Sequence, residues 1–434
     1  MKTLIICHNP ISSDNNMGKT LLSLFDAFSK EDLCQLYIYP AIPNVKKCSS
    51  YFQISDKMVL DNILKLKNCG REVYPNEEKV QSFERNQFEE KAFTNKKNRR
   101  EIKLIFRSLI WRFGRWYNKS LRNWIEKEKP DVIFAVGGVS SFFYPLVIKI
   151  SKRYNLPIVT YVCDDFYFSK KKKDIISKIY YSILKRNIRK MILKSSNIVS
   201  ICDLLSKKYN EFFDKNALTI YTGTQLEDNV IIEKKTKSTN ISYFGNLFIG
   251  RNIALSEIGK TLDKINKERN TDFKLNIYTN TNDKGVKTVF EGIESVCINS
   301  FVSPEKVVRL MKDSFLLIHV EGFAKEDVER VRYSMSTKIP ESLNSGVCLF
   351  AYGPLEDVSI QYLSENNCAI VAEAKDLLKT RLETALFNDK IRNDCMSKAM
   401  EVVRQNHDKN SQSNKLKVLL EETVLQAKKE GEIK

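Results

Sequence analysis

The sequence predicts an α/β protein of two domains, on the basis of three observations. Its 434 residues exceed one typical domain and suit two domains of about 200 residues each. Short apolar runs alternate with longer segments whose apolar residues recur at helical spacing, which is the pattern of a mainly parallel sheet with helices. The hydrophobic content of 42% and the aromatic content of 10% are sufficient for two cores.

The first predicted strand covers residues 3–7, and a polar loop and a helix follow it. The Gly-Lys-Thr tripeptide that begins at Gly18 is similar to the end of a phosphate-binding P-loop. A P-loop also requires a glycine five positions earlier, where this chain has Ser13. The sequence therefore argues against an ATPase.

Two segments of the first half carry most of the net charge of +18. Residues 91–130 contain thirteen Lys or Arg against three Asp or Glu, and residues 161–200 contain ten against three. Helical spacing of apolar residues predicts one basic amphipathic helix over 100–125 and another over 170–194. All three tryptophans lie in the first helix, and basic residues with interfacial aromatic residues indicate contact with an anionic membrane. Alternatively, the apolar faces pack on the sheet and the basic faces are solvated.

Two aspartates follow a predicted strand of the first domain. The apolar run 157–163 ends at Asp164 and Asp165. Ligands of open α/β sheets gather at the carboxyl ends of strands, so these carboxylates are well placed for chemistry. The alternative is that one of them only caps the next turn. Other strands of this domain are expected over 33–39, 131–138, 197–202 and 218–221.

The second half begins after a polar segment, 222–238, which predicts a linker. Gly245 lies in the turn after a strand that starts at residue 241, and Arg251 precedes a helix. Such a turn lets a phosphate approach the backbone, and an arginine can bind it through two hydrogen bonds. The charged segment 321–335 is long for a connection and is expected to be a loop that lines a site. Other strands are expected over 275–279, 315–320 and 368–371, and helices over 304–311, 356–363 and 409–430.

Residues 336–354 predict a short helix that leads directly into a buried strand. Ser336 or Thr337 can cap this helix, and Pro340 fits its first turn. Gly346 supplies the left-handed residue that ends it. The apolar run after the glycine has the length of a strand.

Lys338 and Glu341 lie at the amino end of this short helix. Free backbone N–H groups and a lysine favour a phosphate there, and a carboxylate can accept hydrogen bonds from paired sugar hydroxyls. The helix start therefore has groups for both the phosphate and the ribose of a nucleotide. An ordinary capped surface helix explains the cap and the glycine, but not the lysine and glutamate beside the proline.

The run Thr-Lys-Ile-Pro-Glu-Ser-Leu-Asn-Ser-Gly, with the apolar strand and Tyr-Gly-Pro after it, resembles the donor-binding segment of GT-B glycosyltransferases, especially the GT4-like group. The resemblance covers most of the chain and is strongest over 240–354. It implies a GT-B fold, in which two Rossmann-like domains face each other across a cleft. We expect an acceptor-binding domain over 1–222, a donor-binding domain over 223–408, and a C-terminal helix over 409–434 that crosses back to the first domain.

The resemblance also implies roles for individual residues. The expected donor-binding residues are Gly18, Gly245, Arg251, Val302, Lys338 and Glu341. Among them, Glu341 is expected at the ribose, Val302 at the base, and the two cations at the diphosphate. Asp164 or Asp165 is expected to orient the acceptor or to act as a base. Many GT4-like enzymes have a second acidic residue eight positions before Glu341, where this chain has Tyr333.

The implied function is transfer of a sugar from a nucleotide-sugar to a glycan or lipid-linked glycan, in cell-surface polysaccharide synthesis and with retention of configuration. Arg251 and Lys338 are expected to stabilise the leaving diphosphate without a metal ion or other cofactor. The ten cysteines form no CxxC pair and fit buried thiols in a reducing cytoplasm. We expect a cytoplasmic protein at the inner face of the membrane, held by the basic helices over 100–125 and 170–194, with no nucleic-acid partner.

Two other classes of function stay open. One is a transferase of another phosphate-activated group on the same scaffold. The other is a non-enzymatic basic protein that binds an anionic membrane or nucleic acid, as the net charge of +18 suggests. Against nucleic acid, the charges alternate with isoleucine-rich helix faces, and no known DNA- or RNA-binding motif occurs.

Overall fold

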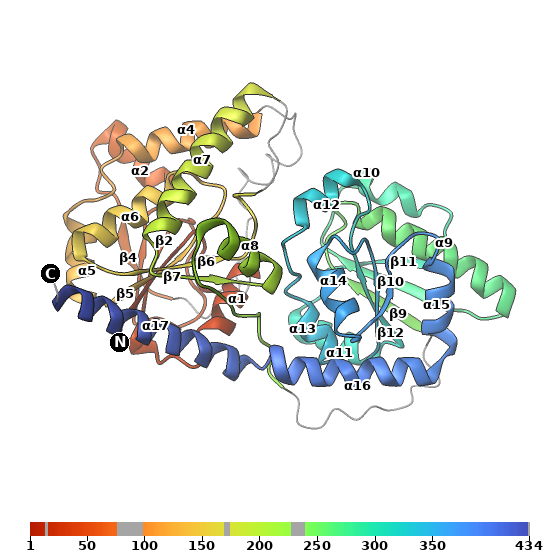
Figure 1. Cartoon of the computed structure of the whole chain (residues 1–434). Coiled ribbons are helices and arrows are strands. Elements are labelled where there is room, and N and C mark those ends of the chain that lie inside the picture. Colours follow the sequence, from red (N-terminus) through yellow and green to blue (C-terminus); the bar gives the residue numbers. More distant parts are fainter. Residues whose placement is uncertain (14–15, 76–98, 169–173, 227–238, 433–434) are drawn as a thin grey trace. The chain divides into compact units, whose positions relative to one another are not determined.

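The computed structural model describes residues 1–13, 16–75, 99–168, 174–226 and 239–432 (Figure 1). The chain divides into two compact units. The first unit contains Met1–Thr222 together with Asn410–Lys434, and the second contains Gly223–Lys409. Each unit has one sheet covered by helices, so the predicted α/β class with two sheets is confirmed.

The first unit contains an eight-stranded sheet in the order β4-β3-β2-β1-β5-β6-β7-β8. Its strands are β1 (Thr3–Cys7), β2 (Leu33–Tyr37), β3 (Ser50–Gln53), β4 (Arg71–Val73), β5 (Val132–Val136), β6 (Ile158–Val162), β7 (Asn197–Ser200) and β8 (Ala217–Thr219). All pairs are parallel except β3 with β4. The central strands are wholly buried, as their continuous apolar runs predict.

Helices connect these strands. They are α1 (Asn16–Leu24), α2 (Asp56–Lys65), α4 (Arg99–Phe113), α5 (Lys119–Glu128), α6 (Phe143–Tyr154), α7 (Ile175–Lys194) and α8 (Asp203–Phe213). Three elements near the β4 edge of the sheet, β3, α2 and β4, are not among those predicted from the sequence. Residues 76–98, which follow β4 in the chain, lie outside the described residues. The same holds for residues 169–173, which overlap the start of the second predicted basic helix.

The C-terminal helix α17 (Lys409–Glu432) packs on the first unit. The Ser413 hydroxyl donates to the carbonyl of Leu24 and accepts from the N–H of Ala27, both at 2.8 Å. Farther along, Asn197 donates from its side chain to the Thr423 hydroxyl at 2.8 Å. Leu416 and Leu420 on the same helix are fully buried, so α17 contributes to the core of the first unit.

The predicted helix over 100–125 is wrong, because the structure has two helices there, α4 and α5. Gly114 follows α4, and a Cβ on it would lie 2.2 Å from Cγ1 of Val59 on α2, so only glycine fits this close approach. Asn118 then caps α5 by accepting from the N–H of Leu121 at 3.1 Å. A glycine and an asparagine therefore end one helix and begin the next within the basic segment.

The three tryptophans are not at the surface, which corrects their predicted interfacial position. Trp111, Trp116 and Trp124 are only 2%, 8% and 1% exposed. The indole N–H of Trp111 donates to Asp56 at 2.6 Å, and that of Trp124 donates to Ser50 at 3.0 Å. A buried indole N–H needs a hydrogen-bond partner, and Trp111 and Trp124 find theirs on α2 and β3. None of the helices in the described part of the chain has the length and hydropathy needed to span a bilayer.

The second unit contains a six-stranded parallel sheet in the order β11-β10-β9-β12-β13-β14. Its strands are β9 (Asn240–Phe244), β10 (Lys274–Thr279), β11 (Val296–Ser300), β12 (Leu316–Val320), β13 (Leu349–Tyr352) and β14 (Ile370–Ala372). Its helices are α9 (Arg251–Arg269), α10 (Lys284–Lys287), α11 (Pro304–Asp313), α12 (Lys325–Val331), α13 (Ile339–Leu343), α14 (Val358–Glu365), α15 (Leu378–Phe387) and α16 (Asp389–Asn406).

Two local predictions for the second unit are wrong. The segment 321–335 is not only a loop, because it contains α12. The cap of α13 is neither Ser336 nor Thr337: Lys338 occupies the N-cap position, with helical backbone angles and no side-chain cap. Gly346 has the predicted left-handed backbone, with φ of 72°, but it does not end the helix: α13 ends at Leu343, and Asn344 is its C-cap.

Candidate functional site

The candidate site lies where the strand order of the second sheet reverses. The chain leaves β9 towards β10 and β11 on one side, and later returns on the other side through β12, β13 and β14. At such a point the loops after the two central strands diverge and leave room for a ligand at their carboxyl ends. Here the loops concerned follow Phe244 of β9 and Val320 of β12.

Glycines allow these two loops to pack directly against each other. Gly250 has φ of 71°, and a Cβ on it would lie 2.8 Å from Cα of Gly322. Gly245 begins the loop after β9, and a Cβ there would lie 2.5 Å from the hydroxyl of Tyr243. This close packing places the first residue of α9, Arg251, beside the end of β12.

Arg251 forms a two-bond ion pair with Glu321. Its Nε lies 3.1 Å from Oε2 and its Nη2 lies 2.9 Å from Oε1 of the carboxylate. The side chains are only 17% and 2% exposed. Burial works against the charged guanidinium, but Glu321 outweighs it, and the pKa of Arg251 is raised. Burial likewise raises the pKa of Glu321 while Arg251 opposes that shift. A fork of two parallel hydrogen bonds fixes the plane of the guanidinium at the end of β9.

Lys338 brings a second cation to the same place. Its Nζ donates to the carbonyl of Phe244, the last residue of β9, at 2.8 Å. It also acts electrostatically on both Glu321 and His319. The structure therefore brings the predicted residues Arg251, Lys338 and Gly245 together. Glu341 lies three residues beyond Lys338, exposed on α13.

Three further residues belong to this cluster and are absent from the sequence-based prediction. Glu321 and His319 lie at the end of β12, and Asp357 caps α14 by accepting from the N–H of Ser359 at 2.8 Å. Burial, and then Arg251 and Lys338, lower the pKa of His319 to about 3. Burial, and then Glu321, raise the pKa of Asp357. Of the three, only Glu321 and Asp357 could have been proposed as site residues from the sequence, since each is an acidic residue close to the end of a predicted strand.

The charge balance of the cluster favours an anion. At neutral pH Arg251 is charged and His319 is neutral, and the raised pKa of Asp357 favours its protonated form. Glu321 pairs with Arg251, and Lys338 brings a second basic side chain to the cluster. The start of the long helix α9 adds a positive dipole end at the same edge of the sheet.

Replacing His319 by glutamine is expected to change how stability depends on pH. The folded protein keeps His319 neutral down to a pKa of about 3, whereas in the unfolded chain a histidine takes a proton near pH 6.5. Wild-type stability therefore falls as the pH falls below 6.5, by up to about 1.4 kcal/mol per pH unit from this group. Relative to His319→Gln, the wild type should lose about 2 kcal/mol between pH 7 and pH 5 in urea unfolding followed by circular dichroism. A difference that stays constant with pH would contradict this.

Val302 lies after β11, at the far edge of the same sheet, and is partly exposed. Ser303 caps α11 by accepting from the N–H of Lys306 at 3.4 Å. Val302 thus belongs to the same carboxyl-end face of the sheet as Gly245, with β10 between their strands.

The remaining predicted residues belong to the first unit. Gly18 is buried in the first turn of α1, the helix that follows β1. Asp165 accepts from the N–H groups of Tyr167 at 3.0 Å and Phe168 at 2.6 Å, so it shapes the turn after β6. Asp164 instead lines a small cavity of about 20 Å³ together with Tyr161 and other residues of β6 and α7. Of the two aspartates, Asp164 is therefore the one that faces a cavity.

His8 is, after His319, a second buried histidine that was not among the residues predicted from the sequence. It follows β1 directly, beside the reversal of strand order between β1 and β5 in the first sheet. Burial, and then Arg107, lower its pKa to about 3, and its ring stacks on Phe143 with centroids 5.3 Å apart. Among the described residues no group of three or more His, Cys, Asp or Glu side chains is arranged to hold a metal ion.

No protein-family model matches the sequence, and no curated protein is significantly similar to it. Solved structures do resemble the chain. A trehalose 6-phosphate synthase from Burkholderia multivorans has a TM-score of 0.64 at 10% identity, with 99% of this chain and 98% of that chain covered. WaaG, a glycosyltransferase involved in lipopolysaccharide biosynthesis, has a TM-score of 0.58 at 12% identity, with 95% and 98% covered. A sucrose-phosphate synthase from Thermosynechococcus elongatus has a TM-score of 0.61 at 8% identity, with 97% and 98% covered. The chain therefore has the GT-B fold that the sequence resemblance implies.

Proposed function

We propose that the protein is a glycosyltransferase that moves a sugar from a nucleotide-sugar to a glycan or lipid-linked glycan. The observation that carries the proposal is the pair of cations, Arg251 and Lys338, at the reversal of strand order in the second sheet. Several structures of the same fold agree with this chemistry. A trehalose-phosphate synthase from Burkholderia vietnamiensis is UDP-forming, and a trehalose-6-phosphate structure from E. coli is bound with UDP-2-fluoro glucose.

The cations act on the leaving group. When the bond from the anomeric carbon to the diphosphate breaks, its electron pair stays on the diphosphate oxygen. Arg251 and Lys338 stabilise that developing charge in a site already arranged for it, so a metal ion is not required. Glu321 keeps the guanidinium oriented before the donor binds. The acceptor oxygen bonds to the anomeric carbon and loses its proton, for which Asp164 is the proposed orienting group or base. We further propose retention of configuration and a role in cell-surface polysaccharide synthesis.

The other donor contacts follow the same arrangement. Glu341, exposed near Lys338, binds the ribose hydroxyls, and the backbone at Val302 contacts the base. Gly245 and Gly18 leave space where the donor approaches the backbone. Asp165 is proposed to support this chemistry by holding the turn that presents its neighbour, because its carboxylate already accepts two backbone N–H groups.

A thermal-shift screen of UDP-, GDP-, CMP- and dTDP-sugars tests this proposal. A specific donor is expected to raise the melting temperature in proportion to the logarithm of its concentration. Glu341→Ala should reduce the shift by weakening nucleotide binding at least tenfold, as expected when a charged hydrogen-bond acceptor is lost. Glu356→Ala, a change of an acid outside the cluster, is the matched control. Unchanged nucleotide affinity in Glu341→Ala would remove the proposed ribose contact.

Product analysis separates the alternatives. Release of UDP or GDP from a sugar donor supports glycosyl transfer, and release of CMP supports transfer of another activated group. Failure of every nucleotide-sugar to bind, together with tight binding to an oligonucleotide, would support the non-enzymatic basic protein.

We propose that the enzyme works at the cytoplasmic face of a membrane, held by α4 and α7. These helices pack side by side in the first unit, where they are drawn in orange and yellow-green (Figure 1). Large apolar side chains of both helices are exposed, including Phe106 and Phe113 on α4 and Ile175 on α7. Exposed Arg112 and Lys178 lie on the same helices. Apolar side chains bordered by cations are typical of surfaces that bind anionic lipid.

A further inference from the structure

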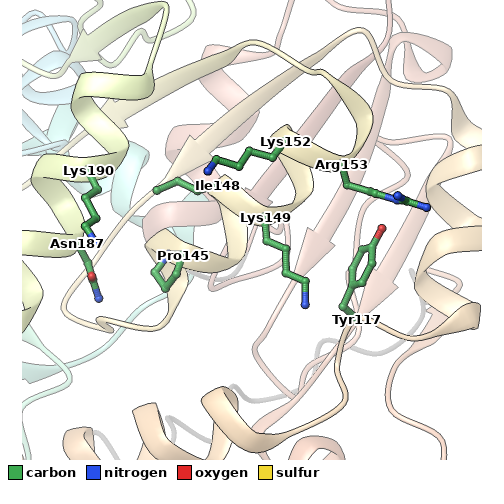
Figure 2. A pocket seen from close by; sticks show the side chains of 8 residues that line it. All are labelled: Tyr117, Pro145, Ile148, Lys149, Lys152, Arg153, Asn187 and Lys190. Carbon is green, nitrogen blue, oxygen red and sulfur yellow. The ribbon is translucent and has the colours of Figure 1, made fainter.

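An open groove of about 550 Å³ lies between α6 and α7 of the first unit. Its lining consists of Tyr117, Pro145, Ile148, Lys149, Lys152, Arg153, Asn187 and Lys190. Figure 2 shows Tyr117, Lys149 and Arg153 together on one side, Asn187 and Lys190 on the other, and Pro145 and Ile148 between them. We call this feature the basic groove.

The basic groove carries four cations and no acid in its lining. Lys149, Lys152 and Lys190 are exposed, as is Arg153. Within the described residues none of these four side chains takes part in an ion pair, so the groove is strongly positive. Four like charges around one hollow repel each other, and an anion placed among them relieves that repulsion.

Aromatic residues hold one of the cations in place. The Lys149 Nζ lies 4.9 Å from the centroid of the Tyr117 ring and 5.0 Å from that of Trp116. Contacts of this kind orient an ammonium group while leaving its hydrogen-bond donors available for a ligand. On the opposite side, Asn187 is fixed by donating to the carbonyl of Ser141 at 3.0 Å. The groove is therefore partly ordered before any ligand binds.

The neighbouring helices α4 and α7 carry rows of exposed apolar side chains. On α7 the row Ile175, Ile179 and Ile183 has a spacing of four residues, and the same row continues to Asn187 in the groove. On α4, which packs against α7, the exposed apolar side chains include Ile102, Phe106, Leu109 and Phe113. Phe113 is 70% exposed and Ile175 is 73% exposed. The basic groove thus lies at the end of the exposed isoleucine row of α7.

We infer that the basic groove binds the phosphate group of a membrane lipid whose chains lie along the exposed rows of α4 and α7. A phosphate monoester or diphosphate has the charge for several cations at once, and the apolar rows account for a hydrocarbon part. A nucleic acid would leave those rows exposed to water. This inference rests on the membrane contact proposed above and extends it to a specific headgroup site.

The test uses the full-length protein and ligands of defined chemistry. The groove variant combines Lys149→Gln, Lys152→Gln, Arg153→Gln and Lys190→Gln. The control variant combines Lys260→Gln, Lys264→Gln, Lys267→Gln and Lys390→Gln, which removes the same charge from exposed positions of the second unit. Binding is measured by calorimetry to dihexanoyl phosphatidic acid below its micelle concentration, to inorganic pyrophosphate, and to a single-stranded oligonucleotide at equal ionic strength.

We expect the groove variant to bind phosphatidic acid at least tenfold more weakly than wild type, since each cation near an anionic lipid contributes about fivefold. The control variant should stay within about twofold of wild type. Equal affinities of the groove and control variants would overturn the site. Pyrophosphate binding as tight as that of the lipid, or tighter oligonucleotide binding, would overturn the lipid assignment.

Two further measurements keep this result separate from the proposed function. Both variants should keep the wild-type thermal shift with the nucleotide-sugar, because the groove lies in the first unit and the cation cluster in the second. Sedimentation with vesicles of phosphatidylcholine and phosphatidic acid then tests the membrane contact, using Phe106→Ser with Phe113→Ser to interrupt the apolar rows. Lipid binding in solution without vesicle binding would contradict the membrane contact but not the headgroup site.

Discussion

Replacing Lys338 by alanine is expected to lower kcat/KM for the nucleotide-sugar donor by about 10² to 10³-fold. Lys338 lies at the carboxyl end of β9, beside Arg251 and Glu321, where the proposed function places the leaving diphosphate. Because the charge on the diphosphate grows in the transition state, most of the loss should fall on kcat rather than on KM. The measurement is the steady-state rate of nucleotide release with the donor identified in the screen.

The matched control is Lys390→Ala, since Lys390 is exposed on α16. It should retain the wild-type rate. The folding of Lys338→Ala is checked by its melting temperature, which should change little because a half-buried lysine contributes little to packing. If Lys338→Ala releases nucleotide at the wild-type rate, the cation pair is not the group that stabilises the diphosphate.

Replacing Glu321 by alanine is expected to destabilise the second unit by about 3–5 kcal/mol. The change leaves Arg251 buried without its carboxylate, and the pair is 17% and 2% exposed in the wild type. Urea unfolding followed by circular dichroism measures this. The unfolding transition reported by tryptophan fluorescence should be unaffected, because all three tryptophans lie in the first unit.

A double variant distinguishes the loss of an ion pair from a general loss of packing. Glu321→Gln with Arg251→Met removes both charges and is expected to recover most of the stability, because apolar replacement of a buried pair is often neutral. Glu326→Ala, at an exposed position of α12, should change stability by less than about 0.5 kcal/mol. If Glu321→Ala is as mild as Glu326→Ala, the ion pair contributes nothing to the fold.

Much of the fold could be predicted because local pattern and local structure agree. The apolar runs at β1, β5, β6 and β12 are long enough to identify as buried strands, and Gly346 has the left-handed backbone that its sequence context indicates. The edge strand β4 was not predicted, because it buries only one of its three residues and so shows a weak apolar pattern. Its neighbour β3, which has only four residues, was also missed. The basic segment over 100–125 was predicted as one helix, although the structure has two helices there. Continuous helical spacing hid the break at Gly114, a position that only glycine fits because the side chain of Val59 on another helix lies so close.

The sequence by itself determined the α/β class, the order of the strands along the chain, and the positions of Arg251 and Lys338 at the starts of helices. Each of these depends on residues close together in the chain. Only the tertiary structure decided which distant side chains meet. Glu321 reaches Arg251 because the loops after β9 and β12 pack through Gly250 and Gly322. Cations that are 87 positions apart lie at one strand end because β12 and β9 are neighbours, a pairing set by packing of the whole sheet.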